Sequence, residues 1–229
     1  MIRAVGFDLD DTLYDHSQYV RGAYRDVAAA VERVTGISAD EFFERIFPDW
    51  QRRTSRCDRI FADALRDAAV YSLELERELV GIYRAHHPTL TAHPGVREGL
   101  DSLRAAGIRL GLLSDGQLAV QQRKLRTLNL TDCFDACVFT GALGRDFYKP
   151  HDAGFVQLAN ALNVRPEELV YVGDNPFTDF DAPRRLGITT IRVLTGEYRE
   201  HEPALASVCH TFTSVALAME WLLTATRSG

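Results

Sequence analysis

The chain has 229 residues and a formal net charge of −6 at pH 7, with 46% hydrophobic and 25% charged residues. This length and balance predict a soluble globular protein with one full α/β core and room for a smaller second unit. The negative charge argues against a nucleic-acid-binding protein, which needs a basic face, and no apolar run reaches the ~18 residues that span a membrane.

An acidic residue occurs too early in the sequence for the apolar region of a signal peptide, so we expect a cytoplasmic protein. The four cysteines, Cys57, Cys133, Cys137 and Cys209, lack the spacing of a zinc finger. Free thiols in a reducing compartment are therefore favoured over a metal site at Cys133 and Cys137. A monomer and a homodimer fit the sequence equally well.

Short apolar runs bounded by Gly, Asp or Pro alternate along the chain with longer amphipathic stretches. The runs predict buried strands, and the amphipathic stretches predict helices. This alternation predicts a Rossmann-like, doubly wound parallel sheet with helices on both faces. The predicted strands cover 2–7, 108–113, 136–139, 169–172 and 188–194, and the predicted helices cover 95–106, 118–129, 153–163 and 180–186.

Residues 14–91 break this alternation, because their apolar residues recur at helical spacing and form no convincing strand. A helical segment of this length directly after the first strand predicts an inserted cap domain. We therefore expect an α/β core of residues 1–13 and 92–229, and an all-helical cap of residues 14–91, with hinges at both junctions.

Polar clusters follow the predicted strands, at the edge where ligands bind in an open parallel sheet. Asp8 and Asp10 end the first strand two residues apart, so both carboxylates can reach one small volume. Ser114 ends the second strand, and Asp115 and Gly116 follow it, a combination of hydroxyl and backbone N–H groups that suits an anion. Each pattern alone is also a common strand end, turn or helix cap.

Two more clusters lie in the second half of the chain. Lys149 precedes Pro150 and a predicted helix, and it is one of only two lysines among 26 basic residues, the other being Lys124. A chain that otherwise uses Arg indicates a need for a compact ammonium at these positions. Asp174 ends the fourth predicted strand, and with Asp179 it suits a hard cation and an anchor for an ammonium.

Together these clusters resemble the motifs of the haloacid dehalogenase superfamily, which are hydrolases with an aspartate nucleophile. The resemblance covers essentially the whole chain and includes a helical cap after the first strand, as in subfamily I. It implies a Mg²⁺-dependent phosphatase that acts on a small phosphorylated metabolite through an aspartyl-phosphate. The matching residues are Asp8, Asp10 and Thr12, then Ser114, then Lys149 with Pro150, and finally Gly173, Asp174 and Asp179.

The resemblance implies a role for each residue of the first and last motifs. Asp8 would be the nucleophile and a Mg²⁺ ligand. Asp10 would be the general acid and then the base, with its main-chain carbonyl on the metal. Asp174 would be the second carboxylate ligand of the metal. Asp179 would orient Lys149 or a metal-bound water.

The phosphate-binding group implied by the resemblance consists of Ser114, Lys149, Thr12 and Asp115. Asp115 is a departure from the pattern, because Asn often follows the serine in related enzymes. It adds an anion near the phosphate site unless a cation such as Arg123 answers it, so its role stays open at this stage.

Three other functions compete with a phosphatase. A haloacid dehalogenase would use Asp8 to attack carbon, but it needs neither metal nor an acid at position 10, because halide leaves unprotonated. A phosphosugar mutase would share the phosphoaspartyl step and pass the group to a sugar hydroxyl. A non-catalytic binding protein with this fold would be expected to lack one or more motif carboxylates, and all are present.

The cap offers candidates for contact with the rest of the substrate, although a solvated helical surface is the favoured interpretation for them. Sugar phosphates, nucleotides, phosphoglycolate and acyl-sugar phosphates all remain open as substrates. The cap and hinge candidates are Arg52, Arg53, Arg56, His16, Arg21 and Tyr24.

Overall fold

The chain is described by a computed structural model that divides into two compact units. We call Met1–His16 with Leu90–Gly229 the core unit, and Ser17–Thr89 the cap unit. Residues 1–54, 59–201 and 208–227 are described. Arg56 and Cys57, which the sequence singled out, lie outside them.

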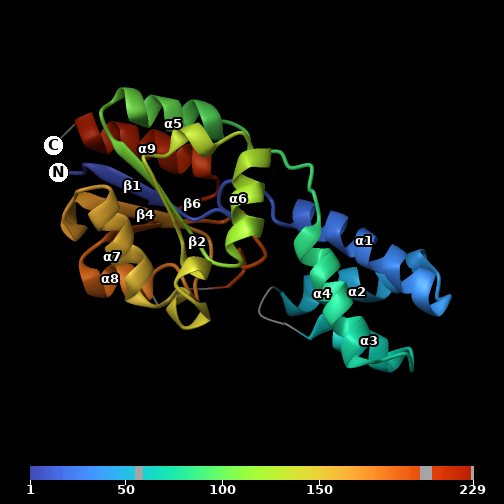
Figure 1. Ribbon diagram of the computed structural model, residues 1–229. Coiled ribbons are helices and arrows are strands. Elements are labelled where there is room, and N and C mark those ends of the chain that lie inside the picture. Colours follow the sequence, from blue (N-terminus) through green and yellow to red (C-terminus); the bar gives the residue numbers. More distant parts are fainter. Residues whose placement is uncertain (55–58, 202–207, 228–229) are drawn as a thin grey trace. The chain divides into compact units, whose positions relative to one another are not determined.

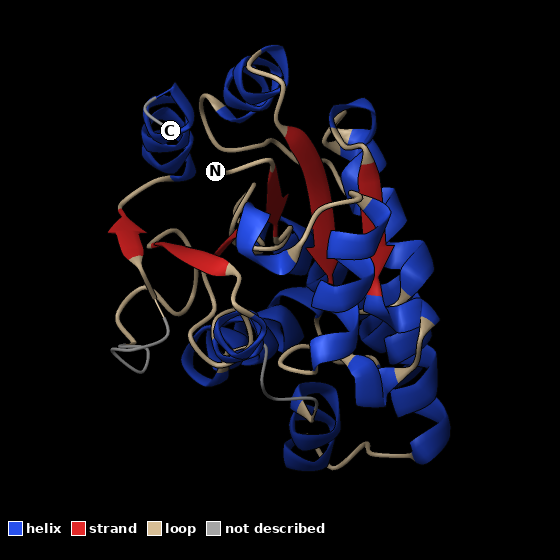
Figure 2. Cartoon of the chain, turned by 90° about the vertical axis from the view of Figure 1, so that its left-hand side faces the viewer, coloured by secondary structure: helices blue, strands red, loops and turns tan. Residues whose placement is uncertain are grey.

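The core unit contains a six-stranded parallel sheet in the order β3-β2-β1-β4-β5-β6, which confirms the predicted doubly wound fold. The five predicted strands correspond to β1–β5. The edge strand β6 was not predicted, because it has only three residues and is largely exposed. Figure 2 shows that the parallel strands are rotated relative to one another across the sheet, which is the usual twist of a β-sheet. The strands are β1 (Ala4–Phe7), β2 (Arg109–Ser114), β3 (Ala136–Phe139), β4 (Leu169–Gly173), β5 (Thr189–Val193) and β6 (His210–Phe212).

Helices cover both faces of this sheet, with α5 and α9 on one face and α7 and α8 on the other (Figure 1). Glycines in the strands allow α7 to approach closely. A Cβ atom at Gly6 or Gly111 would lie 2.6 Å from a methyl group of Leu158. The core helices are α5 (Val96–Ala105), α6 (Leu118–Thr127), α7 (Asp152–Ala161), α8 (Asp181–Leu186) and α9 (Val215–Arg227), with 3₁₀ turns at Thr131–Cys133, Thr140–Ala142, Arg145–Phe147 and Pro166–Glu168.

The cap unit is helical throughout the residues that the structure describes in it. Its helices bury an apolar core of their own, in which Phe42, Ile46, Leu65 and Leu79 have no measurable exposure. The helical spacing of apolar residues in the sequence therefore reflects packing within the cap. The helices are α1 (Ser17–Thr35), α2 (Ala39–Arg53), α3 (Ile60–Asp67) and α4 (Leu73–Ala85).

Two further sequence expectations concern membranes and thiols. Among the described residues, none of the helices combines the length and the apolar character that crossing a membrane requires. Cys133, Cys137 and Cys209 are free thiols, of which only Cys133 is buried.

Candidate active site

The ends of neighbouring strands bring the predicted acids to one edge of the sheet. Strand β1 pairs with β2 and β4, and its last residue lies opposite Leu112 and Val172. Asp8 and Asp174, which follow β1 and β4, and Ser114, the last residue of β2, therefore lie at the same carboxyl edge, where ligands bind in open α/β sheets. The Asp8 N–H continues the ladder by donating to the carbonyl of Val172, at 2.9 Å.

Lys149 lies between two of these acids. Its Nζ atom donates to Asp8 Oδ1 at 2.5 Å and to Asp179 Oδ1 at 2.7 Å, and it also reaches the Tyr171 hydroxyl at 3.2 Å. The other carboxylate oxygen of Asp179 accepts the N–H of Asn175 at 3.0 Å. Lys149 and both acids are buried, so this ammonium is the countercharge of the predicted nucleophile.

Asp174 completes a group of three buried carboxylates. Asp8, Asp174 and Asp179 each offer an oxygen atom, and these atoms lie within 4.8 Å of one another. The hydroxyl of the fully buried Thr12 donates to Asp174 Oδ1 at 3.4 Å, so Thr12 supports this acid. Buried carboxylate oxygens are the ligands that Mg²⁺ prefers, and the donor set therefore fits that ion.

Burial and neighbouring negative charges raise the pKa values of Asp8 and Asp174. Burial raises the pKa of Asp8 to about 8, although Lys149 opposes the shift. Burial, followed by the charges of Asp11, Asp179 and Asp8, raises the pKa of Asp174 well above its usual value. Burial alone would lower the pKa of Lys149, but Asp179 and Asp8 raise it, so this side chain stays charged. The three carboxylates therefore carry more negative charge than the Lys149 ammonium alone can neutralise.

Asp115 contacts the loop that carries Lys149. Its carboxylate accepts the backbone N–H of Lys149 at 3.1–3.2 Å and the hydroxyl of Thr140 at 2.6 Å. Burial raises the pKa of Asp115 despite these contacts. The neighbouring Ser114 is also buried, and its Oγ accepts the side-chain N–H of Gln121 at 2.7 Å. Asp115 thus joins the β2 end to the backbone at Lys149.

Asp10 lies apart from the three-carboxylate group and has its own lysine. Lys124 Nζ lies 2.8 Å from both carboxylate oxygens of Asp10. Gln121 Nε2 donates to Oδ2 at 2.8 Å, and the Tyr14 hydroxyl donates to Oδ1. Burial would raise the pKa of Asp10, but the Lys124 ammonium and then His16 lower it well below its usual value. Asp10 is therefore an ionised carboxylate in this arrangement.

In the sequence, Lys124 stands out as one of two lysines, without a specific role, Tyr14 lies at a predicted hinge, and Gln121 is not marked by any pattern. These residues belong to no motif, and their importance depends on which face of α6 meets the site. The scarcity of lysine was the available signal, since both lysines are buried against motif acids. The hinge candidate His16 also lies here, with Nε2 3.4 Å from Lys124 Nζ.

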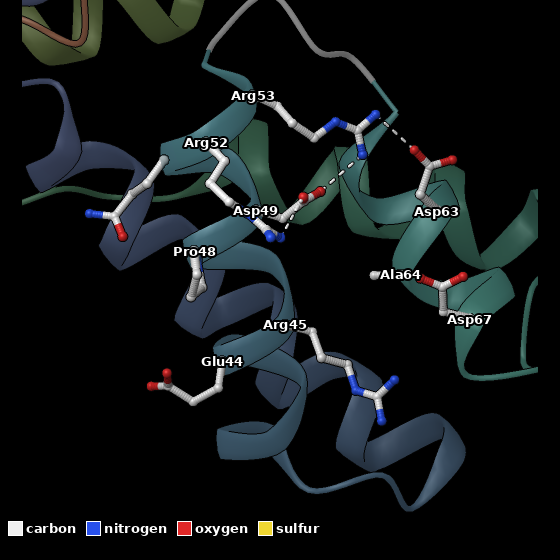
Figure 3. Close-up of a pocket in the computed structure, with 10 residues that line it drawn as sticks. Glu44, Arg45, Pro48, Asp49, Arg52, Arg53, Asp63, Ala64 and Asp67 are labelled. Carbon is white, nitrogen blue, oxygen red and sulfur yellow. Dashed lines mark hydrogen bonds and ion pairs between the residues drawn. The ribbon is translucent and has the colours of Figure 1, made fainter.

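The cap candidates have contacts within their own unit. Arg52, Arg53 and several acids line a groove of about 640 Å³. Figure 3 shows these side chains. Arg53 bridges Asp49 and Asp63 at 2.9 Å each, and Arg52 reaches Asp49 at 3.1 Å. Arg52 and Arg53 thus pair with acids of the same groove, and such exposed ion pairs contribute little to stability.

The remaining two cap candidates stack or pack within α1, α2 and their neighbours. The Arg21 guanidinium lies 4.3 Å from the ring centroid of Phe47. Tyr24 is buried and meets Phe61 edge-on at 5.2 Å. Both side chains therefore have structural partners inside the cap unit.

Comparison with known proteins supports the same fold and family. The model of the haloacid dehalogenase-like hydrolases matches residues 2–207. A glyceraldehyde 3-phosphate phosphatase of Methanopyrus kandleri is 33% identical over 89% of this chain and 88% of its own length. An (S)-2-haloacid dehalogenase of a Pseudomonas species is 28% identical over 84% of each chain.

Solved structures share the architecture at lower sequence identity. A HAD phosphatase from Thermococcus onnurineus superposes with a TM-score of 0.68 at 23% identity, covering 96% of this chain and 98% of its own. The L-2-haloacid dehalogenase of Xanthobacter autotrophicus gives a TM-score of 0.66 at 20% identity, covering 97% and 98%. At this identity the likeness concerns the fold, and both reaction types occur on it.

Proposed function

Because the chain belongs to the haloacid dehalogenase-like hydrolase family, we propose that it is a Mg²⁺-dependent phosphatase of a small phosphorylated metabolite. The observation that carries the proposal is the buried group of Asp8, Asp174 and Asp179, whose oxygens lie within 4.8 Å beside the Lys149 ammonium. A hard cation and a transferring phosphoryl group need this combination of carboxylate oxygens and positive charge.

In the first proposed step, an Asp8 carboxylate oxygen attacks phosphorus. The bond from phosphorus to the leaving oxygen breaks, the electron pair goes to that oxygen, and Asp10 gives it a proton. Lys149 and the Ser114 hydroxyl bind phosphoryl oxygens and offset the negative charge that arrives with the substrate. The product of this step is an aspartyl-phosphate on Asp8.

In the second proposed step, water attacks phosphorus and Asp10 accepts its proton, after which the bond between phosphorus and Asp8 breaks. The ionised Asp10 described above is the form that this step needs. For the first step Asp10 must take up a proton after the phosphate enters, and a nearby anion favours this because it raises a carboxylate pKa.

Mg²⁺ would be held by the carboxylates of Asp8 and Asp174 and by the main-chain carbonyl of Asp10. When bound, it supplies positive charge that lets two anions meet and polarises the phosphoryl group. Asp179 contacts Lys149 at 2.7 Å, so we assign it to orienting that side chain.

The names of the relatives indicate which substrate to test first. Four further relatives, at 28–30% identity, are also named glyceraldehyde 3-phosphate phosphatase. We therefore place that three-carbon phosphate at the head of the substrate panel, followed by phosphoglycolate, sugar phosphates and nucleotides.

The test is phosphate release across some tens of phosphomonoesters, with and without millimolar Mg²⁺. Asp8→Asn should abolish release, whereas Glu220→Gln, at an exposed acid on α9, should leave it unchanged. Equal activity of Asp8→Asn and the unaltered enzyme would refute the mechanism, and no release from any ester would refute the phosphatase.

Dehalogenation is the second candidate, because relatives at 26–28% identity are named (S)-2-haloacid dehalogenase. Chloride release from 2-chloropropionate measures it directly. We expect none, since a halide needs no proton and the acid at position 10 would then have no task. Assaying isomerisation of phosphosugars in the same panel separates a mutase from a phosphatase.

A further inference from the structure

Both lysines of this chain are buried and each pairs with one carboxylate of the first motif. Lys149 contacts Asp8 and Lys124 contacts Asp10, and each lysine side chain is only 4% exposed. The other 24 basic residues are arginines. Burying an ammonium is costly unless a charge answers it, so a second lysine in this position indicates a specific task.

The contacts of Asp10 fix its orientation. Lys124 lies 2.8 Å from both oxygens, Gln121 donates to Oδ2, and Tyr14 donates to Oδ1. Each oxygen thus receives two donors, which is the usual capacity of a carboxylate. Gln121 and Lys124 are three residues apart on α6, so one helix face provides both.

Gln121 also connects Asp10 to the predicted phosphate-binding residue. Its Nε2 atom donates to Asp10 Oδ2 at 2.8 Å and to Ser114 Oγ at 2.7 Å. A single amide group therefore fixes the spacing between the proposed proton-transfer group and a hydroxyl that would hold phosphate. Such spacing matters, since proton transfer depends on the placement of the acid at hydrogen-bond distance.

We propose that Lys124, assisted by Gln121, is a positioning residue that holds the Asp10 carboxylate in the orientation required for both proton transfers. This inference rests on the phosphatase function proposed above. The charged contact is the stronger one, whereas the neutral donors Tyr14 and Gln121 exchange more easily for water or a leaving oxygen. Lys124 can therefore keep Asp10 in place while a lone pair becomes available to the substrate.

The first test is Lys124→Met, which keeps the length of the side chain and removes its charge. With 4-nitrophenyl phosphate the leaving group needs no proton, so phosphorylation of Asp8 should continue while hydrolysis of the aspartyl-phosphate slows. We expect a burst of one nitrophenolate per active site and then a kcat about 10- to 100-fold lower, part of the roughly 10²–10⁴-fold that acid–base catalysis contributes. KM should fall with kcat, because the phosphoenzyme accumulates.

The matched control is Arg126→Met, which removes an exposed cation from the same helix and should change neither kcat nor the burst. Gln121→Leu should act in the same direction as Lys124→Met with a smaller loss, because it removes a neutral donor. A Lys124→Met enzyme with unaltered kcat, or with a burst reduced in proportion to kcat, would overturn the proposal.

The second test is a double-mutant cycle on kcat with Asp10→Asn. If Lys124 acts through Asp10, Lys124→Met should cost less than about 3-fold in the Asp10→Asn background, because the group it positions is already lost. The full 10- to 100-fold loss in both backgrounds would show that Lys124 acts elsewhere and would overturn the assignment.

Failure of the proposed function would have a different signature. If the single variant Asp8→Asn or Asp10→Asn released phosphate as fast as the unaltered enzyme, the proposed phosphatase mechanism would be refuted, whatever the effect of Lys124→Met. If both reduced release as expected and the cycle were additive, only the role of Lys124 would be refuted. Circular dichroism and competitive inhibition by inorganic phosphate confirm that each variant is folded with an intact site.

Discussion

Replacing Asp174 with Asn should stabilise the protein when Mg²⁺ is absent and remove its response to Mg²⁺. Asp174 Oδ1 accepts a hydrogen bond from Thr12, and the amide oxygen of the replacement side chain can accept it too, so Asp174→Asn mainly removes negative charge. That charge lies beside Asp8 and Asp179, and in the described part of the chain Lys149 is the cation that pairs with these two acids.

The magnitude follows from Coulomb's law. Two unit charges at the 4.8 Å limit of the group interact by about 3 kcal/mol at an effective dielectric constant of about 20. For a chain of this size, about 1 kcal/mol shifts the melting temperature by roughly 2–4 °C. We therefore expect Asp174→Asn to raise the melting temperature at pH 8 by about 5 °C or more in the presence of EDTA.

The effect should depend on pH, with a definite sign. The pKa of Asp174 in the folded protein is raised above its unfolded value, mainly by burial. The folded state therefore keeps a proton that the unfolded state has released, and the stability of the unaltered protein falls as pH rises above about 4. The difference in stability between Asp174→Asn and the unaltered protein should therefore be smaller at pH 5 than at pH 8.

The assay is differential scanning calorimetry at pH 5 and pH 8, in EDTA and in millimolar MgCl₂, with ionic strength matched by NaCl. Glu220→Gln makes the same change in net charge outside the group. Mg²⁺ at 100 times its Kd should add about 2.7 kcal/mol to the unaltered protein and little to Asp174→Asn. A lower melting temperature for Asp174→Asn in EDTA at pH 8, or an equal Mg²⁺ response in both proteins, would refute the reasoning.

Three further predictions concern the surroundings of Lys149. Lys149→Met should lower the free energy of unfolding by about 3–5 kcal/mol, because it leaves two buried acids without their partner; urea unfolding at pH 8 measures this, and an unchanged midpoint would contradict it. Gly173→Ala should cost about 1–3 kcal/mol in the same assay and lower kcat, since its Cβ would lie 2.4 Å from Asp179 Oδ2 and must displace it. Asp115→Ala should lower kcat/KM by about 10-fold, because it leaves the buried N–H of Lys149 without an acceptor, which costs about 1–3 kcal/mol. Asp115→Asn keeps an acceptor and should lower kcat/KM less. Equal losses in the two variants would show that the charge of Asp115 matters instead.

The parts of the fold that the sequence predicted are those with strong periodicity. The apolar runs that became β1, β2, β4 and β5 are almost entirely buried, and the Gly and Asp residues around them mark their ends. Strand β3 is only partly buried, and it was predicted from its apolar residues alone. The short edge strand β6 gave no such signal, because His210 and Thr211 are exposed and no alternation could develop over three residues. Helix α9 was also not among the predicted elements, and its place against α5 depends on packing that single-sequence patterns do not describe.

The candidate site divides in a similar way. The positions of Asp8, Ser114 and Asp174 could be predicted from the strand ends, since parallel strands present their carboxyl ends at one edge of the sheet. The partners of Asp10 could not be derived so simply, because the face that α6 turns toward the site depends on its packing. The contact of Asp115 with the Lys149 backbone depends on the path of an irregular loop, for which the sequence contains no periodic pattern.

Because both lysines are buried, the rate at which their amines are modified can measure how often the surrounding structure opens. A water-soluble acylating reagent can modify Lys124 or Lys149 only when the surrounding structure opens, because each side chain is 4% exposed and ion-paired. The modification rate at each position, read by peptide mass spectrometry, would therefore measure local opening at α6 and at the loop before α7 separately. Since every other basic side chain is an arginine, no surface lysine would compete for the reagent.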